Sequence, residues 1–260
     1  SGLISLGGDD EQGPQASASP SAAPIVYPNE ASTGVPPGTS LTSSGSLTIT
    51  QPGTVVDGLE ITGTVIVEAD DVTIRNTRIL NTGAYPVRIS GSKNLVIEDS
   101  EIDGQGNGYA AVAFSNYTLR RVNIHHVTEG PRIAGSNVTI EDSYIHHLVQ
   151  KDDNHTDVVQ ALSGKSIVLR GNNLQAYNPD TGSYGNAAFM FGEEDGLLRD
   201  CIVERNLMNG GNVTVNGGGG GTDGAECTFR ANQFGRDFRY DSHANLGDNV
   251  EWESSNTWRS

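Results

Sequence analysis

Short apolar pairs recur along the chain, and in each pair a polar or small residue separates the two apolar residues. This alternation over three or four positions predicts short β-strands with one buried face. Eight copies of the pattern begin at Val72, Leu95, Tyr117, Val138, Ile167, Cys201, Cys227 and Val250. The first copies are spaced about 22 residues apart and the later ones further apart, which indicates a structural repeat with insertions.

Two more short strands accompany most copies. One follows a Ser, Thr, Val or Asn, as at Ser143 and Ile145, and another precedes a Gly/Ser turn, as in "VRISGS" and "VQALSG". Three short strands per repeat predict one winding of a right-handed, single-stranded parallel β-helix, in which each winding pairs with its neighbours. We therefore predict an all-β solenoid of about eight to nine coils over residues 46–260. Residues 1–45 are rich in Ser, Ala and Pro and predict a flexible leader or linker.

This pattern resembles the pectate-lyase-like superfamily of right-handed parallel β-helix proteins. The stretch "STGVPPGTSLT" is also similar to the beginning of secreted actinobacterial members of that fold. The resemblance implies a secreted or cell-surface protein that acts on, or binds, an extracellular polysaccharide. It does not select the chemistry, because the fold carries lyases, hydrolases, epimerases and adhesins.

Composition narrows the range of partners. The formal net charge of the chain is -16, with 32 acidic and 16 basic residues, so its surface should repel the phosphates of nucleic acids. No run of about 18 apolar residues occurs, which excludes a membrane-spanning helix of ordinary length. We expect a monomer. Cys201 and Cys227 begin matching strands, where they could form a disulfide or remain buried thiols.

One patch of polar residues follows from aligning "GPRIAGSNVTI" with "VVQALSGKSIVL". The alignment pairs Arg132 with Gln160 and points both outward, because the residues on either side are apolar or small. Glu129 and Asp157 lie three residues earlier and should share this patch. Arg88 should continue the column of Arg132 in an earlier winding. Arg88, Glu129 and Gln160 are therefore candidate substrate-binding residues.

The run "QKDDNHTDVVQ" leads into the same patch. It is either a polar turn that caps backbone groups or part of a site in which acid, base and imidazole converge. Lys151 and His155 are candidate catalytic groups, together with Asp157 and Arg132. Three carboxylates of the run could bind calcium, a hard cation that prefers oxygen ligands: Asp152, Asp153 and Asp157.

A block of histidines occupies the same place in two consecutive repeats, "NIHHV" and "YIHHL". This alignment puts His125 beside His146 and His126 beside His147. The block is either a stacked polar ladder or a transition-metal site, although no thiolate or carboxylate stands at a recognised zinc-ligand spacing. His126 and His147 are also candidate substrate-binding residues, because the turn after them leads to Glu129 and Asp157.

Three functions fit these residues, and we predict the first, a polysaccharide lyase that cleaves a uronic-acid-containing glycan by β-elimination. A polysaccharide lyase would use Arg132 or the calcium to neutralise a uronate carboxylate, and Lys151 or His155 to remove the neighbouring proton. The resemblance implies such use of Arg, Lys and carboxylate-bound calcium, but the longer lyase motifs are missing. A glycoside hydrolase would pair Asp157 with Glu129 or Asp153, and a spacing of about 6.5–9.5 Å would give inversion. The third function is non-catalytic glycan binding or adhesion.

Overall fold

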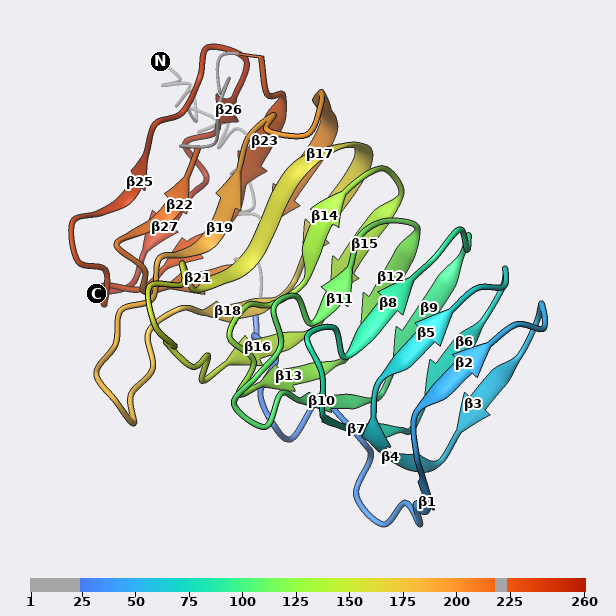
Figure 1. Cartoon of the computed structure of the whole chain (residues 1–260). Coiled ribbons are helices and arrows are strands. Elements are labelled where there is room, and N and C mark those ends of the chain that lie inside the picture. Colours follow the sequence, from blue (N-terminus) through green and yellow to red (C-terminus); the bar gives the residue numbers. More distant parts are fainter. Residues whose placement is uncertain (1–23, 218–223) are drawn as a thin grey trace, which may run out of the picture.

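The structure is a computed structural model that describes residues 24–217 and 224–260. Every named pair of strands in this part of the chain is parallel, and the strands stack winding on winding from the blue end to the red end of Figure 1. The predicted parallel β-helix is therefore confirmed. Over the same residues, no helix is long and apolar enough to cross a membrane.

The strands form three sheets. The ten-stranded sheet contains β1 (Thr42–Ser44), β4 (Leu59–Gly63), β7 (Arg78–Asn81), β10 (Glu101–Asp103), β13 (Asn123–His125), β16 (Tyr144–His146), β18 (Asn173–Gln175), β21 (Leu207–Asn209), β24 (Gln233–Phe234) and β27 (Thr257–Trp258). The four-stranded sheet contains β2 (Leu47–Ile49), β5 (Val65–Val67), β8 (Val87–Ile89) and β11 (Val112–Ala113). The main path of the third sheet contains β3 (Val55–Asp57), β6 (Thr73–Arg75), β9 (Leu95–Glu98), β12 (Tyr117–Arg120), β15 (Val138–Glu141), β17 (Asp157–Arg170), β19 (Ala187–Phe191), β22 (Val213–Asn216) and β25 (Asp241–Ala244). Off this path lie β14 (Arg132–Ala134), β20 (Leu198–Glu204), β23 (Cys227–Arg230) and β26 (Glu251–Trp252).

The register of the third sheet follows the repeat read from the sequence. Val138 pairs with Ile167, Ile167 with Cys201, and Cys201 with Cys227. The two cysteines form a disulfide, which decides between the two states expected for them. The strand β17 runs without a break through two sides of the winding and thereby joins what would otherwise be separate sheets.

Apolar side chains from every winding fill the interior as one continuous core. At the C-terminal end the core is aromatic. Phe229 has no exposed surface, and its ring centroid lies 5.6 Å from that of Phe191 and 5.3 Å from that of Trp252. A buried aromatic ring stabilises the fold more than a buried aliphatic side chain of the earlier windings, because it removes more apolar area from water.

A buried asparagine ladder holds one turn of the later windings. In each step, the side-chain oxygen of one asparagine accepts a bond from the backbone N–H of the asparagine one winding earlier. The ladder runs through Asn172, Asn206, Asn232 and Asn256. Asn206 also donates its side-chain N–H to the Leu169 carbonyl at 3.0 Å. These bonds satisfy backbone groups that a turn in the interior would otherwise leave unpaired.

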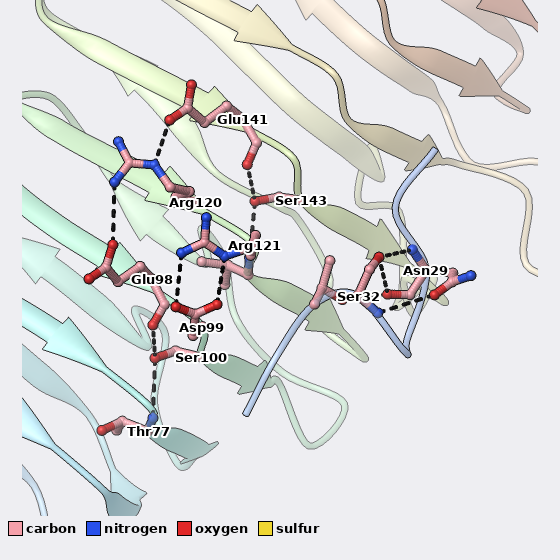
Figure 2. A network of polar contacts seen from close by, with 12 residues as sticks. Asn29, Ser32, Thr77, Glu98, Asp99, Ser100, Arg120, Arg121, Glu141 and Ser143 are labelled. Atoms are coloured by element: carbon pink, nitrogen blue, oxygen red, sulfur yellow. Dashed lines mark hydrogen bonds and ion pairs between the residues drawn. The ribbon is translucent and has the colours of Figure 1, made fainter. Parts of the chain in front are cut away.

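Charges of alternating sign follow the outer face of the third sheet, one from each winding. The column runs through Asp57, Arg75, Glu98, Arg120, Glu141, Arg170, Glu204 and Arg230. Figure 2 shows Arg120 between Glu98 and Glu141, at 3.3 and 2.6 Å. Each exposed pair stabilises the fold by less than about 1 kcal/mol. Stacking an extra or missing winding would put like charges opposite each other, so the column favours one register.

Part of the expected leader, within residues 24–45, bonds to the β-helix. The Pro28 carbonyl accepts a 2.9 Å bond from the Asn173 side chain, and the Gly34 N–H donates to the Arg121 carbonyl at 2.9 Å. The first strand, β1, also begins before residue 45. Polar backbone groups of a Pro-rich segment can bond to the side of a sheet, which composition does not reveal. Residues 1–23 of the expected leader lie outside the described residues.

Candidate active site

The central prediction about the site concerns the register of neighbouring windings. Arg132 pairs with Gln160 and Ile133 with Ala161, as the alignment predicts. Three residues earlier, the Gly130 N–H donates to the Asp157 carbonyl at 3.0 Å, which places Glu129 and Asp157 at equivalent positions. Gly130 allows this approach, because a Cβ there would collide with the Val158 carbonyl.

The outer face of β14, β17, β19 and β22 carries a groove of about 640 Å³. Its chemically active lining is Tyr109, Glu129, Arg132, Asp153, His155, Asp157, Gln160, Asn186 and Glu194. Asp153 and His155 also line a neighbouring hollow of about 470 Å³.

Arg132 lies at the groove but is only 8% exposed. Its guanidinium is ion-paired with Glu129, and it stacks over the Tyr109 ring with 4.3 Å between its Cζ and the ring centroid. The Nε atom is buried and has no hydrogen-bond partner in the described residues. Tyr109 therefore acts as a cover that turns an outward-facing arginine into a desolvated cation.

Asp157 begins β17 and is 2% exposed. Burial raises the pKa of its carboxyl to about 7, an effect that the hydrogen bond from Asn186 opposes and that the charge of Glu129 reinforces. The Asn186 Nδ2 donates this bond to Asp157 Oδ1 at 2.8 Å. A buried carboxyl prefers the neutral form, because the apolar surroundings do not solvate the anion.

Glu129 is the second buried carboxyl, at 8% exposed. Burial raises its pKa to about 7, against the opposing effect of Arg132. The two carboxyls influence each other, so they titrate as a pair. Burial favours the protonated form of both carboxyls near neutral pH. Asp157 is the better place for a proton, because the guanidinium of Arg132 favours the anion at Glu129.

The loop before β17 places two of the predicted residues at the rim. Asp153 and His155 are exposed and line the groove. Lys151 is not among the residues that line the groove, and its Nζ donates to the Asn107 side chain at 2.7 Å. The catalytic role of Lys151 therefore stays a prediction that its position does not support. The loop is longer than one turn, and alternation along a strand does not predict where its side chains point.

Three further candidates do not line the groove. The Arg88 guanidinium stacks on the rings of Tyr85 and Phe114, at 4.8 and 5.4 Å from their centroids. His126 and His147 follow the ends of β13 and β16 on the ten-stranded sheet and do not line the groove. None of the three therefore lines the groove, and their substrate-binding role stays a prediction. The turn that follows the ten-stranded sheet separates the two histidines from Glu129.

The residues predicted to bind calcium do not fit that ion as a group. Asp157 is buried and bonded to Asn186, whereas Asp152 and Asp153 are exposed. Among the described residues, the ligand atoms that converge for a metal belong to another cluster, at Asp103, His125 and His126. Calcium binding at the groove therefore stays a prediction and has no part in the proposed mechanism.

Sequence reasoning missed Tyr109 and Asn186, both of which position a predicted residue. The repeat could have revealed Tyr109, because Tyr109 and Glu129 occupy equivalent positions on neighbouring windings. The Glu129 N–H donates to the Gly108 carbonyl at 3.0 Å, which sets this alignment. Asn186 stands at the end of an inserted loop, where the repeat gives no alignment.

Residues 41–235 match a protein family described as "Right handed beta helix region". The chain belongs to this family. The β-helix family fits polysaccharide-active proteins broadly, but the match does not select a reaction or a substrate. The searches of curated proteins and of solved structures returned no significant match. The finer resemblance to pectate-lyase-like and actinobacterial proteins stays a prediction.

Proposed function

We propose that this β-helix protein is a glycoside hydrolase that cleaves an extracellular polysaccharide in the groove. The observation that carries the proposal is the pair of buried carboxyls, Glu129 and Asp157, at equivalent positions on neighbouring windings. Glycoside hydrolysis requires one carboxylic acid and one carboxylate on either side of the scissile bond. The raised pKa of both groups, about 7, supplies these two forms at neutral pH.

The two carboxyls take different roles because their partners differ. Asp157 donates its proton to the glycosidic oxygen as the bond to the anomeric carbon breaks. Glu129 in its ionised form, which Arg132 favours, attacks that carbon and forms a glycosyl ester. Water then hydrolyses the ester while Asp157 takes up a proton from it. Atoms and charge balance over the two steps, and both carboxyls return to their starting forms.

The spacing of the windings favours retention of configuration. Adjacent windings lie about 4.8 Å apart, closer to the carboxyl separation of about 5–5.5 Å in retaining enzymes than to about 6.5–9.5 Å in inverting ones. This changes the inverting geometry expected for a hydrolase from the sequence. Retention rather than inversion can be read directly from the anomer that first appears in proton NMR spectra.

The charge of the groove favours a neutral glycan. Four carboxyl side chains line it, Glu129, Asp153, Asp157 and Glu194, against the single guanidinium of Arg132 and the imidazole of His155. The whole chain carries a net charge of -16. A polyuronate would therefore meet repulsion along most of its length.

A lyase is the second candidate, and one observation favours it. Arg132 and Asp157 both line the groove, so a guanidinium and a carboxyl face the same bound sugar. In that reaction Arg132 would neutralise the substrate carboxylate, and ionised Asp157 would remove the C5 proton. The ion pair with Glu129 opposes this role, because it already occupies the same cation.

The test is a screen of neutral glycans and polyuronates, with calcium and with chelator. New reducing ends without ultraviolet absorbance from an unsaturated uronate support the hydrolase. Absorbance on polyuronates overturns it in favour of the lyase, and binding without either product overturns it in favour of a glycan-binding protein. Asp157→Asn should abolish turnover, whereas the control Asp153→Asn, an exposed carboxylate at the same rim, should retain it.

We also propose that the protein acts outside the cell. The Cys201–Cys227 disulfide supports this location, because such bonds persist mainly in oxidising compartments. Fractionation of the producing cells, with the protein in the medium or wall fraction, is the expected result. Recovery in the cytosol alone would contradict it.

A further inference from the structure

The histidine block contains a second constellation of chemically active side chains, on the ten-stranded sheet and outside the groove. Asp103 ends β10, His125 ends β13, and the two residues are register partners. His126 follows in the left-handed conformation with φ of 53°. One carboxylate oxygen and two imidazole nitrogens thereby lie within 4.8 Å of one another.

The hydrogen bonds of His125 decide which of its nitrogens is available. Its Nε2 lies 2.7 Å from Glu101 Oε1, and a carboxylate oxygen can only accept, so Nε2 carries the proton. The lone pair is therefore on Nδ1, which lies 2.7 Å from His126 Nδ1 and 4.0 Å from Asp103 Oδ1. Glu101 is itself held by Arg78 Nε at 2.7 Å. An imidazole oriented by a carboxylate is the usual outer shell of a metal-binding histidine.

Asp103 is also held in place. The Gln105 backbone N–H donates to Asp103 Oδ1 at 2.9 Å, and the Gln105 Nε2 donates to Oδ2 at 2.7 Å. The spacing between Asp103 and the histidines along the chain matches no recognised zinc motif. The winding of the helix, rather than sequence proximity, supplies the carboxylate.

We propose that Asp103, His125 and His126 form a binding site for a divalent first-row transition ion such as Zn²⁺. Two imidazoles and one carboxylate suit these ions, whereas Ca²⁺ takes six to eight oxygens. His126 is exposed, so water can complete the coordination. The ion needs the neutral form of His126 with its proton on Nε2, which leaves Nδ1 free to bind. This site is independent of the proposed hydrolysis.

The next winding provides a matched control. His146 and His147 repeat the geometry, with their Nδ1 atoms 2.6 Å apart. The register partner of His146 on the preceding strand is His125, so no carboxylate occupies the register position of Asp103. The nearby Asp180 carboxylate lies 3.6 Å from Nε2 of His147 and not beside the Nδ1 pair. The side chain that orients His146 is Asn123, at 2.7 Å, rather than a glutamate. This second pair therefore lacks the third ligand and should not bind the ion.

The test is titration of the chelator-treated full chain with Zn²⁺ by calorimetry and with Co²⁺ by its visible absorbance. We expect one ion per chain. Changes to outer-shell residues alone weaken metal binding about 10–100-fold, so we expect Glu101→Gln to lower the affinity for the ion by a factor in that range. Asp103→Asn and His126→Asn each remove a ligand, and each should lower the affinity by about 100-fold or more. Asparagine at position 126 tolerates the left-handed backbone, so the fold should persist, as circular dichroism will report.

His147→Asn should bind within about threefold of the unmodified protein, because position 147 contributes no ligand. Three results would overturn the proposal. The first is absence of binding at one ion per chain. The second is an unchanged affinity in both Asp103→Asn and His126→Asn. The third is an equal loss in His147→Asn, which would mean that the imidazoles bind the ion without regard to the carboxylate.

Discussion

Replacing Asp157 by asparagine should change the pH dependence of stability in a defined direction. The folded-state pKa of Asp157 is about 7, against an ordinary value of 3.8. Between these two values the folded protein keeps a proton that the unfolded chain has released. The contribution of Asp157 to the free energy of unfolding is therefore fully present below about pH 4, falls as the pH rises, and is lost above about pH 7.

The size of the effect follows from the shift in pKa. A shift of about three units corresponds to at most about 4 kcal/mol, because each unit is worth about 1.4 kcal/mol. Asparagine cannot ionise, and its carbonyl can still accept the bond from Asn186. Relative to the unmodified protein, Asp157→Asn should therefore gain stability as the pH rises from about 4 to 8.

Thermal unfolding midpoints measured across this pH range will show the gain. For a chain of this size about 1 kcal/mol moves the midpoint by about 2–4 °C, so the difference between the two curves should widen by several degrees. The control is Asp153→Asn, whose exposed carboxylate stands in the same loop and whose curve should run parallel to that of the unmodified protein. A constant offset between Asp157→Asn and the unmodified protein at every pH would refute the reasoning.

Three other measurements address the fold and the reaction. Phe229→Ala should cost about 3–5 kcal/mol in denaturant unfolding, whereas Tyr240→Ala, at a side chain 68% exposed, should change stability by less than about 0.5 kcal/mol. Asn206→Ala should lower the free energy of unfolding by about 1–3 kcal/mol for each buried backbone group left unpaired. Asn154→Ala, at an exposed side chain, should leave it unchanged, and equal effects of the two substitutions would contradict a role for the asparagine ladder. Glycan cleavage should be maximal near pH 7, because the carboxyl pair must hold one proton, and a rate that keeps rising to pH 9 or above would contradict this.

The register was predictable because it depends on a periodic property. Apolar residues that must face one core recur once per winding, so aligning them places Arg132 beside Gln160 and His125 beside His146. The same logic would have found the alternating charge column, since its members occupy one position of the repeat. Residues on regular strands are therefore accessible from the sequence.

Contacts made by turns and inserted loops were not predictable in this way. The alternation shows that Arg132 points outward but not that Tyr109 covers it, because the cover comes from an irregular segment before β11. Lys151 bonds to Asn107, 44 residues earlier, and no repeat aligns those two residues. The candidate site could thus be located, while the partners that set its electrostatics required coordinates.

Cleavage of neutral glycans and of polyuronates in water labelled with heavy oxygen tests the central claim most directly. Hydrolysis by the carboxyl pair predicts one labelled oxygen at each new reducing end, seen by mass spectrometry, and no product from Asp157→Asn. Products without label, carrying an unsaturated terminal sugar, would contradict the account, as would full activity in Asp157→Asn.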